Sequence, residues 1–136
     1  MRIIQLLLIL LLLASTQASA AERLDRDVMT AGLAGSFVRP DGKDPAKAVL
    51  MIAGSGPTDR NGNSRLGVAA NYLEMLARHL SGASIASLRY DKRGVGDSDG
   101  DYDSAGLHNN IDDAEAALAF LGAQDGVDPE RVVVVG

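Results

Sequence analysis

The most regular feature of the chain is a series of short apolar stretches bounded by glycine, proline and polar residues. Four of them have the length and composition of strands: Leu33 to Arg39, Ala48 to Ala53, Ile85 to Leu88 and Val132 to Val135. The second and the last are apolar on consecutive residues, which is typical of strands covered on both faces. We therefore expect a buried sheet, with the polar segment from Ala21 to Ala31 as a leader into its first strand.

Between these stretches, apolar residues recur at the spacing of amphipathic helices. The first predicted helix ends at Gly82 and carries Ala69, Tyr72, Leu73, Leu76 and Leu80. The second has Asn109 or Asn110 as its N-cap, acids in its first turn at Asp112, Asp113 and Glu115, and an apolar face of Ile111, Ala114, Leu118 and Leu121. Helices that alternate with strands predict an α/β fold, with a largely parallel, doubly wound sheet joined by right-handed crossovers.

The first 20 residues differ from the rest of the chain. Arg2 is followed by an apolar run from Ile3 to Ala14 and then by small and polar residues up to Ala20. This order is typical of a secretory signal peptide, and Ala18-x-Ala20 predicts cleavage after Ala20. The run is shorter than the about 20 residues that span a bilayer, which disfavours a retained membrane anchor. We therefore expect a signal peptide at 1–20, one domain at 21–136, and a secreted or periplasmic protein.

Charge and cysteine content exclude several classes of function. The chain has 13 basic and 18 acidic residues, for a net charge of −5. Cleavage after Ala20 would remove one arginine and leave 12 basic residues against 18 acidic ones, a net charge of −6. This balance disfavours nucleic acid and anionic lipid as partners. The chain has no cysteine, which excludes thiol catalysis, cysteine-ligated zinc, disulfides and acylation of a lipoprotein cysteine.

A glycine-rich turn follows the third apolar stretch, within the segment Ser84 to Gly100. It has the pattern Asp-x-Arg-Gly-x-Gly-x-Ser, formed by Asp91, Arg93, Gly94, Gly96 and Ser98. In open α/β sheets, ligands bind at the carboxyl ends of the strands, so this turn is a candidate wall of a site. The motif resembles the turn after a central strand in the α/β-hydrolase superfamily. We expect Asp91 to accept hydrogen bonds from turn amides and Arg93 to clamp neighbouring loops, in preference to direct catalysis.

The loop after the second apolar stretch carries another pattern of that superfamily, Gly54-Ser55-Gly56-Pro57. The resemblance implies that this loop supplies a backbone N–H to an oxyanion hole, with Ser55 as the first candidate donor and Gly56 as the second. The alternative is that the glycines only make a tight turn. Ser55 is not expected to be a nucleophile, because Ala53 and Pro57 stand where Gly-x-Ser-x-Gly requires glycine.

The last residues resemble the strand that leads into a nucleophile elbow. Gly136 would be the first glycine of Gly-x-Ser-x-Gly, and we expect the valine run before it to be buried beside Leu88. The resemblance covers Leu33 to Gly136 and is to the N-terminal half of an exported hydrolase of the serine-aminopeptidase-like and acyl-esterase-like branch. It implies an incomplete α/β-hydrolase sheet and hydrolysis of a small-molecule ester or amide through an acyl-enzyme, without an organic or metal cofactor. The serine, acid and histidine of a triad are not among these residues. The 136 residues alone are therefore expected to be inactive.

A competing hypothesis is an exported, non-enzymatic domain that binds a ligand or calcium through the Gly54 to Ser64 and Asp97 to Asp103 loops. The alternating aspartates of the second loop do not complete an EF-hand, because its required glycine and glutamate fall on Tyr102 and His108. A solvated acidic loop is the preferred interpretation. A Rossmann-like nucleotide binder is a third possibility, and it lacks a phosphate-binding motif.

Overall fold

The computed structural model describes residues 26–42, 45–67 and 69–136. They form five strands and two helices, in the order β1 Arg26–Thr30, β2 Leu33–Val38, β3 Ala46–Met51, α2 Tyr72–Gly82, β4 Ile85–Tyr90, α3 Leu107–Gly122 and β5 Val127–Val135. The predicted signal peptide lies outside the described residues. None of the described helices combines the length and hydrophobicity that crossing a membrane requires.

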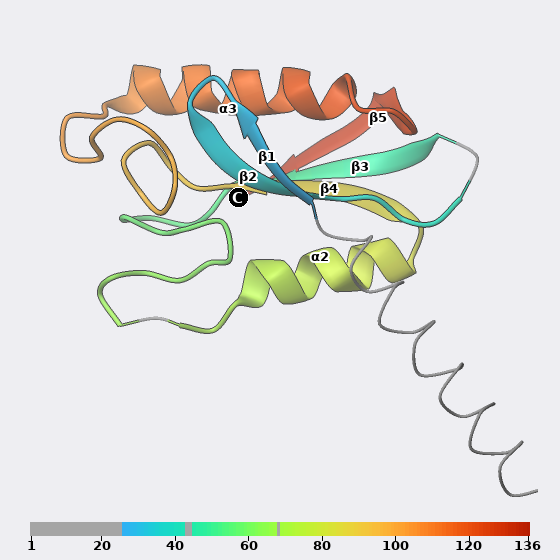
Figure 1. Ribbon diagram of the computed structural model, residues 1–136, viewed down its shortest axis with the longest axis horizontal. Helices are drawn as coiled ribbons and strands as arrows, with labels where there is room; N and C mark the ends of the chain where they lie inside the picture. Colours follow the sequence, from blue (N-terminus) through green and yellow to red (C-terminus); the bar gives the residue numbers. More distant parts are fainter. Residues whose placement is uncertain (1–25, 43–44, 68) are drawn as a thin grey trace, which may run out of the picture.

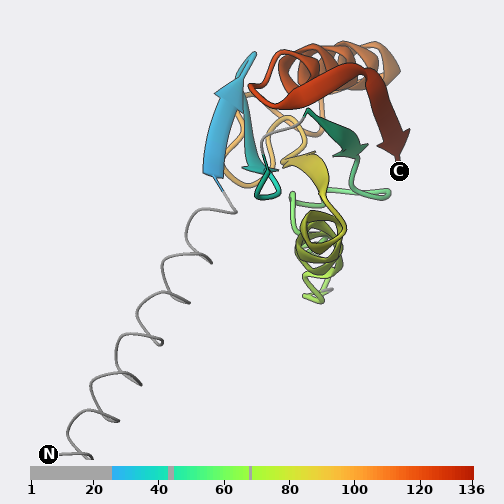
Figure 2. The same ribbon diagram turned by 90° about the vertical axis from the view of Figure 1, so that its right-hand side faces the viewer.

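The strands form one sheet in the order β1-β2-β4-β3-β5, with β1 and β5 at its two edges (Figure 2). The pairs β1–β2 and β2–β4 are antiparallel, whereas β3 pairs in parallel with both β4 and β5. Four of these five strands therefore share one direction and only β2 runs the other way. Helix α3 covers one face of the sheet and α2 covers the other (Figure 1). The predicted doubly wound and largely parallel α/β sheet is confirmed.

The sheet separates two hydrophobic cores. On the α3 side, Leu50 and Leu88 pack with Leu121, and on the α2 side Met51 packs with Leu73. Leu50 and Met51 are consecutive residues of β3 and enter opposite cores, because successive side chains of a strand point to opposite faces. The inference that this strand is covered on both faces is correct, and its apolar residues on consecutive positions are the reason it lies between two layers.

Both edge strands differ from the expectations. The segment expected to be a leader forms β1, in which exposed Arg26, Asp27 and Met29 are interspersed with half-buried Val28 and Thr30. Its hydrogen bonds to β2 make it a strand although it buries little apolar surface. An edge strand of this kind has a weak hydrophobic pattern, because it has a neighbour on one side and solvent on the other.

The valine run lies in β5, and the expectation that it is buried beside Leu88 is wrong. Strand β3 stands between them, since Leu50 is paired with Leu88 on one side and with Val134 on the other. Val133 is 58% exposed and Val135 is 40% exposed. Among the described strands, β5 pairs only with β3, so the outer side of the valine run has no neighbour.

Helix α3 begins earlier than the sequence predicts. Its N-cap is Gly106, and Asn109, expected as a cap, instead accepts a hydrogen bond from the Gly106 N–H through its side-chain oxygen at 3.1 Å. Asp113 is therefore not in the first turn. It lies on the buried face of the helix with Ala117 and Leu121, four residues apart, and this places a carboxylate inside the protein.

Candidate active site

The carboxyl ends of β3, β4 and β5 meet at one edge of the sheet, on the left in Figure 1. A cavity of about 500 Å³ opens there. It is lined by residues from the loop after β3, the end of β4, the acidic loop with α3, and the end of β5: Ile52, Ala53, Gly54, Ser55, Gly56, Tyr90, Lys92, Tyr102, Asn110, Asp113 and Gly136. Both glycine-rich loops therefore reach the same edge of the sheet, as expected for an open α/β sheet.

In the loop after β3, three successive carbonyl groups are held and two N–H groups are left available. The ammonium of Lys92 donates to the carbonyl oxygen of Gly54 and to that of Gly56, the latter at 3.0 Å. The Thr58 hydroxyl donates to the Ser55 carbonyl oxygen at 3.1 Å. Within the described part of the chain, no acceptor is recorded for the N–H of Ser55 or of Gly56. Two donors at the wall of a cavity are the arrangement that could stabilise an anionic oxygen.

Asp91 connects the two glycine-rich loops. Its side chain is 3% exposed, and its two oxygens accept the N–H of Arg60 at 2.7 Å and the N–H of Asp97 at 3.0 Å. The Arg60 guanidinium lies 3.6 Å from the carboxylate. Asp91 therefore binds one amide of its own turn, at Asp97, and one of the other loop, at Arg60, which is also its ionic partner. Bound on both oxygens, it is placed to fix the loops and not to act on a substrate.

The remaining motif residues shape the turn around Asp91. The Ser98 hydroxyl donates to the Asp91 carbonyl oxygen at 2.7 Å and accepts the Ala34 N–H at 2.9 Å, which ties the turn to β2. Gly96 has a φ of +55°, and a Cβ there would lie 2.3 Å from the Asp91 carboxylate. Gly94 has a φ of +70°, and a Cβ there would lie 2.3 Å from the Tyr102 backbone nitrogen. Both glycines are thus required by conformation and by space.

Arg93 clamps the turn to α3. Its Nε lies 3.2 Å from one oxygen of Asp113 and its Nη2 bonds the other, so the pair is bidentate. The side chain of Asp113 is 4% exposed, and the hydrogen bond with its carboxylate raises the pKa of Arg93. Arg93 is expected from the sequence to clamp neighbouring loops, and its partner in the structure is instead a helix residue, Asp113 of α3. Both oxygens of Asp113 are thus used to hold Arg93.

Tyr90 ends β4 at the floor of the cavity. Burial, and then the negative charge of Asp113, raise the pKa of its phenol to about 12, from an ordinary value of 10.0. The hydroxyl therefore stays protonated well above neutral pH, and a protonated phenol that lines the cavity is a possible hydrogen-bond donor there.

The shifted pKa of Tyr90 predicts a loss of stability at high pH. Because the folded state resists ionisation, stability is retained below pH 10 and falls as the pH rises towards 12, by up to about 3 kcal/mol. We expect urea unfolding curves at pH 9 to 12 to show this loss in the wild type and a smaller loss in Tyr90→Phe. Parallel losses in the two proteins would contradict the prediction.

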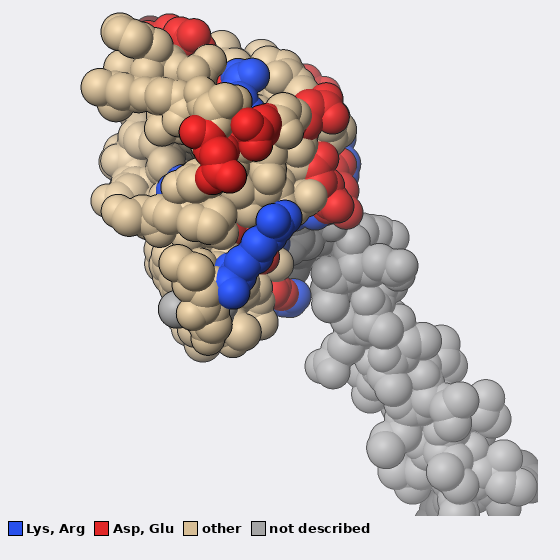
Figure 3. Space-filling view, turned by 90° about the vertical axis from the view of Figure 1, so that its left-hand side faces the viewer, with Lys and Arg blue, Asp and Glu red and all other residues tan. Residues whose placement is uncertain are grey.

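The acidic loop between β4 and α3 is exposed on the same edge, where acidic side chains gather in Figure 3. Asp97 pairs with Arg60 at 2.8 Å, and the Asp101 carboxylate accepts the Ser104 N–H at 3.2 Å. Within the described ranges, no group of three or more acidic or histidine side chains is placed to hold a metal ion. In this exposed loop, the Asp97 carboxylate thus bonds Arg60 and the Asp101 carboxylate bonds the loop's own backbone.

Gly136 follows β5 at the mouth of the cavity. The Ile52 N–H donates to the Val135 carbonyl oxygen at 2.8 Å. This brings the end of β5 beside the start of the loop Gly54 to Pro57, called the oxyanion-loop candidate below. A Cβ on Gly136 would lie 3.2 Å from Ile52 Cβ. The predicted elbow glycine therefore lies at the cavity that Ser55 and Gly56 also line.

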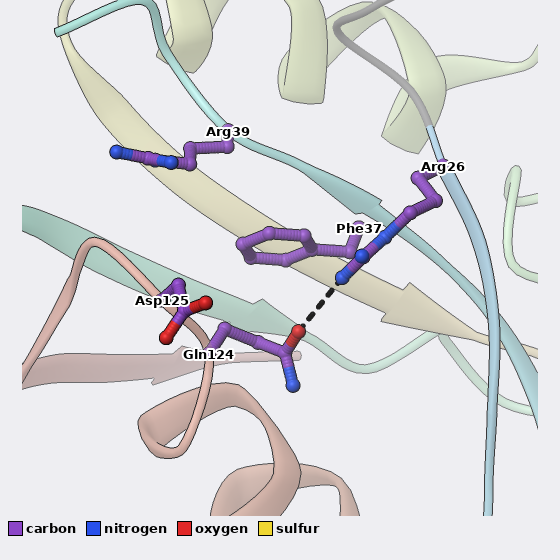
Figure 4. Close-up of a pocket in the computed structure, with 5 residues that line it drawn as sticks. All are labelled: Arg26, Phe37, Arg39, Gln124 and Asp125. Carbon is purple, nitrogen blue, oxygen red and sulfur yellow. Dashed lines mark hydrogen bonds between the residues drawn. The ribbon is translucent and has the colours of Figure 1, made fainter.

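A second cavity, of about 310 Å³, lies near the amino ends of the parallel strands (Figure 4). Its two arginines are already hydrogen-bonded. The guanidinium of Arg26, 5.6 Å from the centroid of the Phe37 ring, donates to the Gln124 side-chain oxygen at 2.8 Å. Arg39 donates to the Gly42 carbonyl oxygen at 3.3 Å. Neither a nucleophile nor a loop donor of the predicted motifs lines it, so we place the candidate active site at the first cavity.

Sequence reasoning missed the roles of three residues: Lys92 and Asp113, which line the first cavity, and Arg60, which pairs with Asp91 and Asp97. A signal existed for Asp113, because an acid four residues before Ala117 and eight before Leu121 lies on an apolar helix face and needs an internal partner. For Lys92, the signal was weaker. It lies two residues after Tyr90, and the two side chains line the same cavity, as the alternation of side chains along an extended segment predicts.

Comparisons with known proteins found similar folds among solved structures. A scan against models of protein families and a search among curated proteins each found no match. Among solved structures, the chain is similar to a hypothetical protein from Pseudomonas aeruginosa, with a TM-score of 0.67 and 23% identity over 82% of this chain and 34% of that one.

The description of one further neighbour names a hydrolase, and that of another names a bound molecule. The chain is similar to an alpha/beta hydrolase from Penicillium sp., with a TM-score of 0.61 and 18% identity over 81% of this chain and 35% of that one. It is also similar to Est1E from Butyrivibrio proteoclasticus, solved with ferulic acid bound, with a TM-score of 0.58 and 18% identity over 82% of this chain and 41% of that one. This chain thus spans less than half the length of each neighbour.

Proposed function

We propose, from the α/β-hydrolase fold that the chain shares with these neighbours, that it provides the oxyanion-binding part of a serine hydrolase acting on small-molecule esters or amides. The chain has the N-terminal part of that fold, and a nucleophile elbow would continue from Gly136. In this proposal, the N–H groups of Ser55 and Gly56 stabilise the negative oxygen of a tetrahedral intermediate. The branch that we favour is that of serine aminopeptidases and acyl esterases.

The observation that supports the proposal is the free pair of N–H groups on the wall of the cavity at the strand ends. All three carbonyl groups of Gly54, Ser55 and Gly56 are bound, whereas the two N–H groups between them have no acceptor within the part of the chain that the structure describes. A loop that only made a tight turn would not need to keep two donors at a cavity. Donors held rigidly before a reaction are the main requirement of an oxyanion hole.

The remaining parts of the proposal concern export and partners. Residues 1–20 would direct the chain out of the cytoplasm and be removed after Ala20. The partner would be a small-molecule ester or amide, with neither nucleic acid nor a membrane anchor involved. Mass spectrometry of the exported protein tests this directly, because cleavage after Ala20 gives a chain that begins at Ala21.

The chemistry is tested by the DNA that follows the Gly136 codon and by an assay. We expect the reading frame to continue with x-Ser-x-Gly, where x is any residue, so that Gly136 becomes the first glycine of Gly-x-Ser-x-Gly. The 136 residues alone should not hydrolyse p-nitrophenyl acyl esters above the blank. A frame that continues without this serine contradicts the proposal, as does turnover by the 136 residues that survives Ser55→Ala and is blocked by a serine-directed phosphonate.

A further inference from the structure

Lys92 binds the oxyanion-loop candidate at two points. Its ammonium donates to the carbonyl oxygens of Gly54 and Gly56, across 38 and 36 residues of sequence. In the described part of the chain, no carboxylate forms an ion pair with it, and desolvation lowers the pKa of Lys92 below its ordinary value. Burying a cation without an acidic partner costs free energy unless hydrogen bonds compensate, and here the two carbonyl oxygens supply them.

Because a peptide group is planar, a hydrogen bond to its carbonyl oxygen also fixes the direction of its N–H. The Gly54 carbonyl and the Ser55 N–H belong to one planar, trans peptide and point in opposite directions. When Lys92 holds the Gly54 oxygen, it fixes the Ser55 N–H on the side away from the ammonium. The Gly56 carbonyl belongs to the peptide with Pro57, which has no N–H, so the second hydrogen bond anchors the far end of the loop without turning a donor.

We propose that Lys92 is a positioning residue that sets the direction of the Ser55 N–H and so preorganises the oxyanion loop. This inference rests on the proposed function for its meaning in catalysis, and the loop geometry that it describes can be measured without any activity. Thr58 has a similar role, because its hydroxyl holds the Ser55 carbonyl oxygen and thereby orients the Gly56 N–H, which belongs to the same peptide group. Each candidate donor thus has its own clamp.

The test is carbon-detected NMR of the 136-residue chain, which correlates each carbonyl carbon with the next nitrogen and therefore also sees Pro57. As the pH rises, the carbonyl signals of Gly54 and Gly56 should move together with the side-chain carbon of Lys92, at a midpoint below 10.5. Tyr90, Tyr102 and Asp113 also line the cavity. Lys92→Met separates their contribution, because it should abolish the transition and shift both carbonyl signals at neutral pH.

Two variants complete the design. Lys92→Arg retains hydrogen-bond donors and should restore the carbonyl signals towards wild-type positions, whereas Lys47→Met removes an exposed lysine of β3 and should leave them unchanged. Carbonyl signals that titrate independently of Lys92, or that do not move in Lys92→Met, overturn the inference. The NMR experiment tests the loop geometry, and the downstream DNA tests the presence of the nucleophile. The positioning role of Lys92 and the hydrolase function can therefore fail independently of each other.

Discussion

Replacing Asp91 with alanine should lower the free energy of unfolding by about 3 to 5 kcal/mol, the range for removing one partner from a buried ionic site. The carboxylate is 3% exposed and accepts the N–H groups of Arg60 and Asp97. Its loss leaves two amides and a nearby guanidinium without their acceptor, and a methyl group cannot replace either oxygen. Guanidinium chloride unfolding, followed by circular dichroism, measures the change.

Two further variants make this prediction specific. Asp91→Asn retains one acceptor oxygen and should cost about 1 to 3 kcal/mol, which remains measurable if the alanine variant does not fold. Asp103→Ala removes an exposed aspartate from the same acidic loop and should change stability by less than about 0.5 kcal/mol. Equal effects of Asp91→Ala and Asp103→Ala would show that the two glycine-rich loops do not depend on the Asp91 carboxylate.

The central part of the fold could be predicted because its sequence signals are strong. Strand β3 is apolar on consecutive positions, and Leu50 and Met51 enter cores on opposite faces of the sheet. Gly94 and Gly96 indicate the turn after β4, and both adopt positive φ in the structure. Few residue types can adopt a positive φ, and few can be buried on both faces of a sheet. A sequence pattern at such positions therefore predicts the local structure well.

The edges and helix faces could not be predicted as well, because their constraints come from neighbours far along the chain. The valine run predicts a buried strand, yet β5 lies outermost among the described strands. Likewise, the helical spacing predicts Leu76 and Leu118 on the apolar faces, yet both are exposed, whereas Ala77 and Ala117 beside them are buried. Adjacent stripes of a helix have similar apolar periodicity, and only the opposing sheet selects between them.

The candidate site divides in the same way. The motifs located both loops, and the assignment of Asp91 to turn amides follows from its position before two glycines. The Lys92 clamp brings together residues on two different loops, and spacing along the chain carries no signal for such a contact, whereas the Thr58 clamp is local and lies three residues from Ser55. Backbone donors that lack an acceptor can be found only once their partners are known, which is why the strongest observation at this site is structural.

Gly94→Ala should lower stability by about 2 to 5 kcal/mol, because the substitution meets two separate costs. A φ of +70° lies in the left-handed region, where a side chain costs about 1 to 2 kcal/mol. A Cβ would also lie 2.3 Å from the Tyr102 nitrogen and 2.7 Å from the Asp101 carbonyl carbon, and these backbone atoms cannot rotate away as a side chain can. Gly56→Ala separates the two costs, since Gly56 has a φ of +86° and nothing within 4 Å of the added atom. Denaturation should therefore show a loss of about 1 to 2 kcal/mol for Gly56→Ala and a clearly larger one for Gly94→Ala. If the two losses are equal, the close approach of the turn to the acidic loop contributes nothing, and the cavity wall that Tyr102 forms is not held by this contact.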